Sequence, residues 1–206
     1  MSNKDDQYIV FGYSGHALSL IDSMLSLGLK IKGYVDKNKI DNYYDIKYLG
    51  SETDENFNYM SSNYLYVVAV GDNKIRQKIS DSIRDLGFHT PNIIDPTAVV
   101  ASQIEMGSGN FISKNAVVNS YCHIGNNVII NTSSIVEHNS FVHDNVHIAP
   151  GAVVCGNVEI RNNSFIGANS VIKNGIKIGK NVTIGAGSVV LNDVKSNSVL
   201  FGNPAN

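Results

Sequence analysis

A six-residue repeat runs through the second half of the chain and constrains its fold more than any other feature. From Ile94 to Val190, every sixth residue is Ile, Val or Met without interruption, which gives seventeen consecutive hits in one phase. Such a run is far beyond chance. Its members are Ile94, Val100, Met106, Ile112, Val118, Ile124, Ile130, Val136, Val142, Ile148, Val154, Ile160, Ile166, Ile172, Ile178, Ile184 and Val190.

A second phase lies two residues before these positions and holds small or β-branched side chains. An α-helix needs a period of 3.6 and a strand a period of two, so a period of six predicts short strands joined by turns in a β-helix. Few charged residues and many Asn and Gly fit turns with left-handed backbone. The second phase comprises Ala116, Cys122, Val128, Ser134, Ser140, Val146, Ala152, Val158, Ser164 and Ser170.

The repeat has a recognisable form, because glycine often follows the aliphatic residue, as at Gly125, Gly167 and Gly179. The pattern Ile-Gly-x-x-(Ser/Ala/Val)-x resembles the repeat of the left-handed parallel β-helix of hexapeptide acyltransferases. It covers residues 94–191, or roughly five coils of eighteen residues. A solenoid alone does not establish an activity, because it could be purely structural.

The first half alternates strands and helices, which predicts a small, Rossmann-like parallel α/β sheet. Leu18, Ile21 and Leu25, with Met24 beside them, should form the apolar face of the first helix. We therefore expect an α/β domain at residues 1–92, followed by an all-β left-handed β-helix at residues 93–206. The predicted elements are strands at 8–11, 31–35 and 64–70 and helices at 17–27 and 74–86, with no clear element at 37–63.

Composition excludes several classes of protein. With 16 Lys and Arg against 18 Asp and Glu, the net charge of −2 argues against nucleic acid or an anionic membrane as the main partner. The longest apolar runs, such as 67–70, are too short to span a bilayer. Residues 1–7 lack a signal-peptide pattern, and two cysteines without a CxxC make no disulfide framework. We expect a soluble, cytoplasmic protein.

The first strand is followed by a candidate anion site, formed by Gly12, Ser14, Gly15 and His16. In an open α/β sheet, ligands bind at the carboxyl ends of strands, where a helix N-terminus presents backbone N–H groups. Ser14 could cap the helix or donate to a ligand, and His16 could reach a phosphate oxygen. The full G-x-G-x-x-G is absent, so NAD binding is unsupported. The alternative is a tight turn in which both side chains only cap.

Further candidates lie at the ends of the second and third strands. Asp36 closes the second strand, where a carboxylate can accept from a ribose or a base. Gly71, Asn73 and Arg76 form the turn after the third strand. Arg76 could be a second anchor for the ligand, or an exposed helix charge.

Two histidines in the solenoid are the candidates for chemistry. His138 lies two residues after inward Val136 and must fall on an outer corner, and His147 precedes inward Ile148 and faces outward. The spacing of His138 and His143 imitates the zinc ligands of β-helical carbonic anhydrases, but the third ligand position holds Ser102, so we expect no metal. The alternative is that these histidines are exposed polar corners with no role.

Three segments in order resemble the sialic-acid and bacillosamine acyltransferase family. Residues 8–16 read Tyr-Ile-Val-Phe-Gly-Tyr-Ser-Gly-His, residues 131–138 read Asn-Thr-Ser-Ser-Ile-Val-Glu-His, and residues 201–205 read Phe-Gly-Asn-Pro-Ala. The family consists of bacterial enzymes with an α/β nucleotide-sugar domain fused to a trimeric left-handed β-helix. Many members use acetyl-CoA to N-acetylate a nucleotide-linked 4-amino-4,6-dideoxy sugar.

The resemblance implies a role for each candidate residue. His138 matches the catalytic base, and Asn139 stands where relatives usually have Asp or Glu, so it can orient the imidazole without adding charge. Gly12, Ser14, Gly15, His16, Asp36, Gly71, Asn73 and Arg76 would bind the nucleotide sugar. His147, Gly156, Gly167, Ala168, Ala186, Gly202 and Pro204 would bind acetyl-CoA, with the N–H of Gly156 facing the thioester oxygen.

The predicted activity is transfer of an acetyl group from acetyl-CoA to a dTDP- or UDP-linked 4-amino-4,6-dideoxy sugar, for bacterial surface polysaccharides such as O-antigen and lipopolysaccharide. Histidine suits general base catalysis near neutral pH. Two alternatives stay open: an O-acetyltransferase acting on sialic acid or a related sugar, and a non-catalytic β-helical assembly subunit. His138 and His147 are nine residues apart, which is one and a half faces of a triangular coil. They cannot share a corner within one chain, so a site that uses both requires two chains. We therefore expect a homotrimer.

Overall fold

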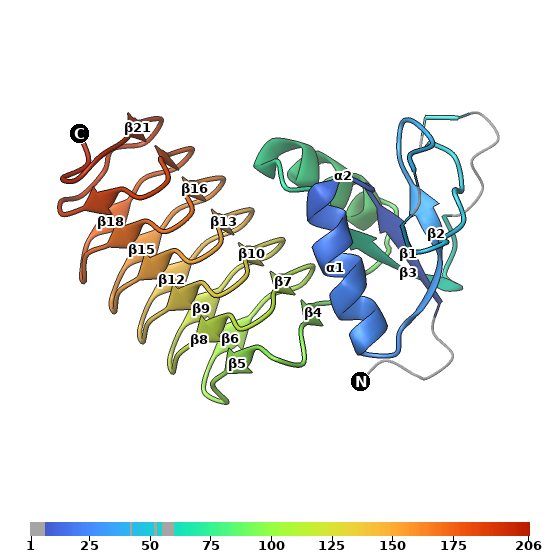
Figure 1. Ribbon diagram of the computed structural model, residues 1–206, viewed down its shortest axis with the longest axis horizontal. Coiled ribbons are helices and arrows are strands. Elements are labelled where there is room, and N and C mark those ends of the chain that lie inside the picture. Colours follow the sequence, from blue (N-terminus) through green and yellow to red (C-terminus); the bar gives the residue numbers. More distant parts are fainter. Residues whose placement is uncertain (1–6, 42, 52, 55–59) are drawn as a thin grey trace. The chain divides into compact units, whose positions relative to one another are not determined.

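The computed structural model describes residues 7–41, 43–51, 53–54 and 60–206, and the chain forms two compact units, Met1–Pro91 and Asn92–Asn206 (Figure 1). The alternation of strands and helices, and then the solenoid, confirm the predicted fold class. Neither helix of the described residues has the length and hydrophobicity that crossing a bilayer requires.

The first unit is a three-stranded parallel sheet with two helices, in the strand order β2-β1-β3. Central β1 is apolar because a parallel strand between two neighbours is buried along its length. Both helices end before a glycine with positive φ, Gly28 at 71° and Gly87 at 80°. The elements are β1 (Gln7–Phe11), α1 (Gly15–Ser26), β2 (Lys30–Val35), β3 (Tyr64–Val68) and α2 (Asn73–Asp85).

The buried face of α1 differs from the predicted one. It consists of Ala17, Leu20, Ile21 and Met24, together with Ser23. Leu25 was expected on this face but is 44% exposed. The reason is the register, since positions 17, 20, 21 and 24 follow the i, i+3, i+4, i+7 spacing of one helical stripe, and Leu25 lies beside it.

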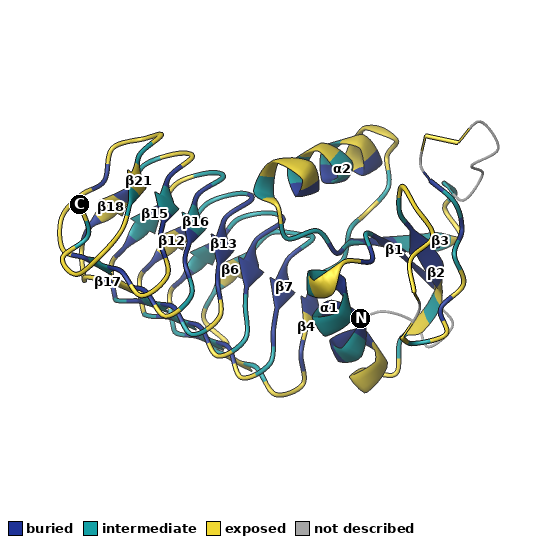
Figure 2. Cartoon of the chain, turned by 45° about the horizontal axis from the view of Figure 1, so that its top comes forward, coloured by how far each residue is buried: buried dark blue, intermediate teal, exposed yellow. Residues whose placement is uncertain are grey.

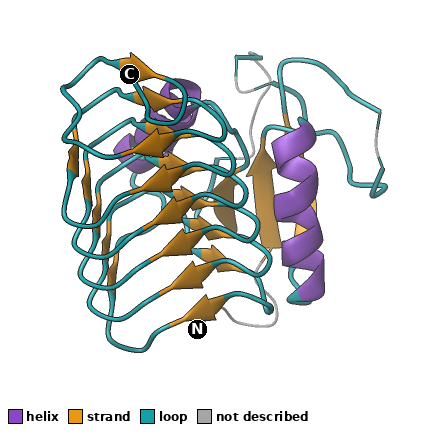
Figure 3. Ribbon diagram, turned by 60° about the vertical axis from the view of Figure 1, so that its left-hand side comes forward, coloured by secondary structure: helices purple, strands orange, loops and turns teal. Residues whose placement is uncertain are grey.

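The second unit is a left-handed parallel β-helix whose strands stack into three flat faces (Figure 3). The seven-stranded face holds β4 (Ile93–Ile94), β7 (Phe111–Ile112), β10 (Ile129–Ile130), β13 (His147–Ile148), β16 (Phe165–Ile166), β19 (Thr183–Ile184) and β21 (Val199–Leu200). The six-stranded face holds β5 (Val99–Val100), β8 (Val117–Val118), β11 (Ile135–Val136), β14 (Val153–Val154), β17 (Val171–Ile172) and β20 (Val189–Val190). The five-stranded face holds β6 (Glu105–Met106), β9 (His123–Ile124), β12 (Phe141–Val142), β15 (Glu159–Ile160) and β18 (Lys177–Ile178).

Successive coils pair residues that are eighteen apart in the sequence, as Ile129 with His147. The seven passes of the seven-stranded face make six coils, so the solenoid is longer than the five coils expected from the repeat. It continues to Leu200 because β21 pairs with β19 after the repeat has lost its strict spacing.

The inward aliphatic column forms the core of this unit, and the strands are mostly dark or teal in Figure 2. Every predicted inward residue from Ile112 to Val190 is buried, and all ten residues of the second phase are fully buried. Ile94 is an exception at 36% exposed, and Val100 and Met106 are only half-buried, because no earlier coil covers the first one. Buried serine hydroxyls donate to backbone oxygens, as Ser164 does to Gly179 at 2.7 Å.

The corners between faces explain the abundance of Asn and Gly. A residue with left-handed φ recurs every six positions, and it is Asn or Gly everywhere except at Tyr121 and Ser133, which confirms the predicted turns. These positions are Gly109, Asn115, Tyr121, Asn127, Ser133, Asn139, Asn145, Gly151, Asn157, Asn163, Asn169, Gly175, Asn181 and Gly187.

Candidate active site

His138 lies on the corner that joins the six-stranded face to the five-stranded face. We call this ridge the His138 corner, and in successive coils it carries Ser120, His138, Gly156 and Asn174. His138 is exposed, as its spacing from inward Val136 predicts. Strand spacing separates neighbours on such a ridge by about 4.8 Å.

The imidazole of His138 rests directly on Gly156. A Cβ built on Gly156 would come within 2.7 Å of the ring atoms Cε1 and Nε2, so only glycine leaves the ring in this position. The carbonyl of Gly156 accepts from the N–H of Gly175 at 3.0 Å and from the side-chain amide of Asn174. Among the described residues no group accepts a hydrogen bond from the N–H of Gly156. A backbone donor without an acceptor in the described part of the chain therefore lies beside the imidazole.

Asn139 sets the tautomer of His138. Its Oδ1 is 2.9 Å from Nδ1 of His138. Because an amide oxygen only accepts, Nδ1 carries the proton and Nε2 keeps the lone pair. Asn139 also occupies a left-handed corner position, at φ 59°, which Asn tolerates well. The amide therefore gives His138 the form of a base.

His147 is in strand β13 of the seven-stranded face, and only 7% of it is exposed. The alternative that it is an exposed polar corner is therefore wrong. Its Nε2 lies 3.1 Å from Nδ2 of Asn131, which donates, and its ring meets Phe165 edge-on at 5.1 Å. The repeat did not predict the contact with Asn131, because it joins residues sixteen apart, whereas the register pairs residues eighteen apart.

Most of the predicted acetyl-CoA residues lie on another ridge, the Gly167 corner, which joins the seven-stranded to the six-stranded face. Gly167 has no room for a side chain, because an added Cβ would lie 2.5 Å from the carbonyl oxygen of Ile184. Ala168 and Ala186 stack in successive coils, and the C-terminal loop with Gly202 and Pro204 continues the ridge. Gly202 accepts from the N–H of Val189 at 2.9 Å. Within one chain, Gly156 is thus separated from the rest of its predicted set.

In the first unit, the turn after β1 leaves the N-terminus of α1 open. Gly12 has φ 94°, and a Cβ there would meet Val70 Cγ2 at 2.8 Å, so the turn requires glycine. Ser14 is the N-cap residue, yet its side chain makes no capping hydrogen bond, and Gly15 borders open space. The alternative that Ser14 only caps the helix is therefore not supported.

Asp36 holds this turn against the end of β2. Its Oδ2 accepts from the N–H of Tyr13 at 2.9 Å, and the ring of Tyr13 stacks on that of Tyr34 at 4.1 Å. Asp36 therefore has a structural role that the sequence did not suggest. A carboxylate has four acceptor sites, so one hydrogen bond leaves capacity for a ligand.

The turn after β3 adjoins the first turn, since a Cβ on Gly71 would contact Cβ of His16 at 3.6 Å. Arg76 is 1% exposed, so the alternative of an exposed helix charge is wrong. Its guanidinium donates to the carbonyls of Val70 and Gly71 and to Oδ1 of Asn73, at 2.8 to 3.2 Å. Arg76 and Asn73 thus shape the turn.

Two of these groups have shifted pKa values. Burial, and then the charge of Arg76, lowers the pKa of His16 from 6.5 to about 4. Burial lowers the pKa of Arg76 to about 10, against the opposing effect of Asp72. His16 is therefore a neutral imidazole at pH 7, which can hydrogen-bond a ligand but brings no charge.

Among the described residues, no group of three or more His, Cys, Asp or Glu side chains could hold a metal ion. His143 instead contacts Glu159, Nε2 to Oε1 at 3.2 Å, and Glu159 also binds Arg161. His138 and His143 thus have different partners.

Comparison with known proteins agrees with this geometry. Residues 7–83 match the PglD N-terminal domain, and residues 139–174 and 157–192 match the bacterial transferase hexapeptide model of six repeats. The acetyltransferase domain of PglB from Neisseria gonorrhoeae FA1090, in complex with acetyl coenzyme A, is 30% identical with a TM-score of 0.92, and the match covers 98% of both chains. The chain belongs to the sialic-acid and bacillosamine-type sugar acyltransferase family.

Two other similarities differ in extent. A perosamine N-acetyltransferase from Caulobacter crescentus, in complex with CoA and GDP-perosamine, is 27% identical to this family member with a TM-score of 0.89, over 97% of this chain and 95% of that one. The uncharacterized protein L142 of Acanthamoeba polyphaga mimivirus is 32% identical over 96 residues. That match covers 47% of this chain and only 19% of the viral protein.

Replacing Gly156 in this sugar acyltransferase tests the support of the imidazole. Gly156→Ala should displace the exposed ring of His138 while keeping the fold, because the ring can rotate away from the new methyl group. We expect kcat to fall roughly tenfold or more, as expected when a general base is displaced, with an unchanged melting temperature. Steady-state kinetics and thermal melting measure the two effects. Full activity in Gly156→Ala would show that the ring does not need this support.

The depressed pKa of His16 gives a pH-dependent stability. Between pH 6.5 and about 4, the unfolded chain takes up a proton at His16 that the folded chain does not, so the free energy of unfolding falls as the pH falls. His16→Gln removes this contribution and should lose less stability between about pH 7 and about pH 5. Urea unfolding of both proteins at the two pH values measures the difference. Equal losses would contradict the assignment.

Proposed function

We propose that the protein transfers the acetyl group of acetyl-CoA to the amino group of a nucleotide-linked 4-amino-4,6-dideoxy sugar. The observation that carries this proposal is the His138 corner. There the lone pair of Nε2 and the N–H of Gly156 lie on one ridge, as an amine–thioester reaction requires. The relatives support the class of substrates, because one is named as bound to acetyl coenzyme A and another to CoA and GDP-perosamine.

The residues suit each step of the transfer. The amine nitrogen attacks the thioester carbonyl, and Nε2 of His138 takes its proton. The negative charge that develops on the carbonyl oxygen meets the N–H of Gly156. The carbon–sulfur bond then breaks, and the imidazolium of His138 returns the proton to the leaving thiolate. A thioester is already activated, so the step needs no metal and no covalent nucleophile.

The first unit would bind the nucleotide part of the acceptor. Ser14 and Gly15 offer N–H groups for the diphosphate, and Gly12, whose own N–H donates to the carbonyl of Val35, forms the tight turn before them. Neutral His16 adds a hydrogen bond, and Asp36 can accept from the ribose or base. Gly71 and the start of α2, with Asn73 and Arg76, would support this site. We propose a dTDP- or UDP-linked sugar, used in bacterial surface-polysaccharide synthesis in the cytoplasm.

The acetyl-CoA site would lie between two chains of a homotrimer. The predicted acetyl-CoA residues lie apart from His138 and Gly156. His147 is on the seven-stranded face, and the Gly167 corner carries Ala168, Ala186, Gly202 and Pro204. A second chain can supply His147 and the Gly167 corner to the His138 corner of the first chain. Between the two corners, the six-stranded face presents Val99, Val117, Ile135, Val153, Val171 and Val189 outward. An aliphatic sheet face of this kind is typical of an interface between subunits.

A panel of acceptors tests the function directly. Pure protein is assayed with acetyl-CoA and with UDP-, dTDP- and GDP-linked 4-amino-4,6-dideoxy sugars, their 4-hydroxy counterparts and free sialic acid. Transfer to an amino sugar nucleotide supports the proposal. Transfer to sialic acid or only to the 4-hydroxy sugars would support the O-acetyltransferase instead. No release of CoA with any acceptor would favour a non-catalytic assembly subunit.

Removing the proposed base should abolish most of the turnover. His138→Ala should lower kcat by roughly 10²–10⁴-fold, with the oligomer and the affinity for both substrates intact. Asn139→Ala should cost less, because its neutral amide only orients the ring. Steady-state kinetics and calorimetry give kcat and the affinities. If His138→Ala kept more than about a tenth of the wild-type kcat, outside that range, the base would have to be another group, with His147 next.

Mixed oligomers test whether the site is shared between chains. His138→Ala and His147→Ala should each be impaired alone. When the two chains are co-expressed, about a quarter of the interfaces in a randomly mixed trimer would join an intact His138 to an intact His147. Activity should then recover to roughly that fraction. Recovery is measured per site in the purified mixture against each parent. No recovery in a verified mixed trimer would place both histidines in sites within one chain.

A further inference from the structure

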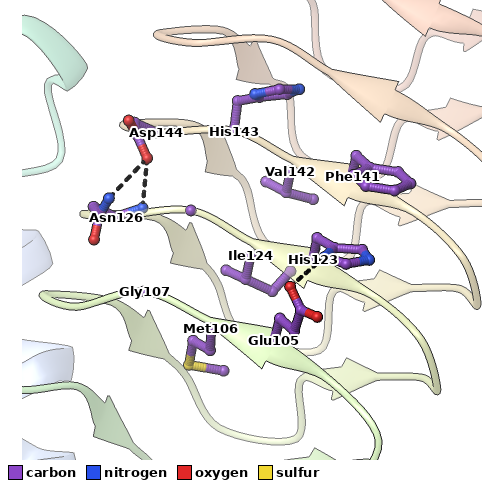
Figure 4. Close-up of a pocket in the computed structure, with 11 residues that line it drawn as sticks. Glu105, Met106, Gly107, His123, Ile124, Asn126, Phe141, Val142, His143 and Asp144 are labelled. Atoms are coloured by element: carbon purple, nitrogen blue, oxygen red, sulfur yellow. Dashed lines mark hydrogen bonds and ion pairs between the residues drawn. The ribbon is translucent and has the colours of Figure 1, made fainter.

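A buried hydroxyl, that of Ser140, lies on the inside of the His138 corner. Ser140 is fully buried and comes directly before β12. Side chains alternate along this extended segment, so Ser140 and Val142 face the core while Phe141 points outward. Figure 4 shows Phe141 stacked on His123 of the previous coil, with ring centroids 4.3 Å apart, beside a surface pocket. The hydroxyl of Ser140 is shut off from this surface, so its partners must come from the solenoid itself.

Two hydrogen bonds connect the Ser140 hydroxyl with the next coil. Its Oγ accepts from the N–H of Val158 at 3.3 Å and donates to the carbonyl of Cys155 at 3.2 Å. A serine hydroxyl has a single proton, and the N–H of Val158 can only donate, so the proton of Ser140 goes to Cys155. Among the described residues, no other group donates to the carbonyl of Cys155.

This carbonyl belongs to the peptide unit that carries the N–H of Gly156. A peptide unit is planar and conjugated, so a hydrogen bond to its oxygen draws electron density from its nitrogen and strengthens the N–H as a donor. The N–H of Gly156 is the group that meets the thioester oxygen in the proposed reaction. The relay from Val158 through Ser140 therefore ends on the peptide unit that the reaction uses.

Gly156 needs such support because it has to be glycine. The ring of His138 leaves no room for a Cβ at this position, and glycine restricts its own backbone less than any other residue. The peptide unit after Gly156 is held at its carbonyl by Asn174 and Gly175. The peptide unit before Gly156 is held at its carbonyl by Ser140. The direction of the N–H is thus fixed from both sides.

We propose that Ser140 is a positioning residue for the acetyl transfer, whose buried hydroxyl orients and polarises the peptide unit between Cys155 and Gly156. The inference rests on the proposed function, in which the N–H of Gly156 stabilises the developing oxyanion. It adds a residue from the interior of the solenoid to the groups that the reaction depends on.

Ser164 provides a matched control in another part of the solenoid. It lies between β15 and β16, on the corner that joins the five-stranded to the seven-stranded face, and is also fully buried. Its Oγ donates to the carbonyl of Gly179 at 2.7 Å and accepts from the N–H of Val182 at 3.0 Å. Ser164→Ala therefore removes an equivalent pair of hydrogen bonds from a corner that carries neither His138 nor Gly156.

Cys122 shows which conservative replacement Ser140 tolerates. It holds the same position one coil earlier, and its Sγ donates to the carbonyl of Glu137 at 3.2 Å. A thiol thus fits this position of the corner and makes the same kind of bond. A thiol is a weaker donor than a hydroxyl, so Ser140→Cys keeps part of the interaction.

Steady-state kinetics with acetyl-CoA and the amino sugar nucleotide compare these variants in the full-length protein. An oxyanion donor is worth about 10²–10³ in kcat, and a coupled hydrogen bond changes donor strength by about 10–30%, so Ser140→Ala should lower kcat by about 2- to 8-fold. Both KM values should stay unchanged, because this donor acts mainly in the transition state. Ser140→Cys should recover part of the loss. Ser164→Ala should keep the wild-type kcat while losing a similar amount of thermal stability.

A second measurement excludes an effect of Ser140 through the nearby base. In a His138→Ala background the remaining turnover depends on the oxyanion donor, so Ser140→Ala should lower it by the same factor as in the wild type. The pH profile of kcat/KM should keep its midpoint in Ser140→Ala. An effect that disappears in the His138→Ala background, or a shifted midpoint, would overturn the proposal, because Ser140 would then act on the imidazole.

The amide resonance of Gly156 gives a readout that does not require turnover. In protein containing ¹⁵N-labelled glycine, this signal is identified by its loss in Gly156→Ala. It should move upfield in Ser140→Ala, because a hydrogen bond to the carbonyl deshields the nitrogen of the same peptide unit, and it should stay in place in Ser164→Ala.

These outcomes separate the positioning role from the proposed function. If the wild type transfers no acetyl group, the proposed function is wrong, and the Gly156 resonance still shows whether Ser140 polarises the peptide unit. If the wild type is active but Ser140→Ala keeps the wild-type kcat or leaves the Gly156 resonance in place, the positioning role is wrong.

Discussion

The stacking of each residue on the residue eighteen positions later is the constraint on which the rest of the solenoid depends. The core stabilises this stacking, because one aliphatic side chain per face fills the interior. Burial of each such side chain contributes about 1.5–3 kcal/mol to the stability of the fold. It is permitted at the corners by residues that tolerate a left-handed backbone. A slip of one residue would turn the whole inward column outward. The register is therefore fixed along the whole solenoid, and with it the neighbours of every outward side chain.

This register determines where His138 and Gly156 lie relative to each other. His138 and Gly156 are eighteen residues apart, so the imidazole necessarily lies over a residue of the next coil, and the absence of a side chain at position 156 lets the ring rest there. The carbonyl of Gly156 is held in turn by Asn174 and Gly175 from the following coil. The proposed base and a backbone donor are thus positioned by three consecutive coils rather than by a loop. Preorganisation of this kind matters because a donor stabilises a developing charge most when it already points at the position of that charge.

The sequence predicted which way the side chains point, but not which residues surround them. A period of six assigns Ile148 inward and His147 outward, and it puts His138 on a corner, as observed. It says nothing about what covers an outward side chain, so the burial of His147 and its contact with Asn131 were not predictable. The same holds in the first unit, where a helix pattern marks Arg76 as polar, while the carbonyls that its guanidinium binds come from the preceding turn. The His123–Phe141 stack was missed because the two residues are in separate repeats and meet only through the parallel register.

Asn139 serves both the backbone of the corner and the imidazole of His138. The corner requires a residue that accepts positive φ, and Asn satisfies that requirement while its Oδ1 holds Nδ1 of His138. A carboxylate in its place would also bring a negative charge beside an imidazolium, whereas an amide brings none. A hydroxyl acceptor needs that help, since its proton must be removed before or during attack. An amine attacks with its own lone pair and sheds a proton that has become strongly acidic in the tetrahedral intermediate. A neutral amide partner is therefore sufficient for an amine and poorly suited to a hydroxyl, which favours N-acetylation over O-acetylation at this corner.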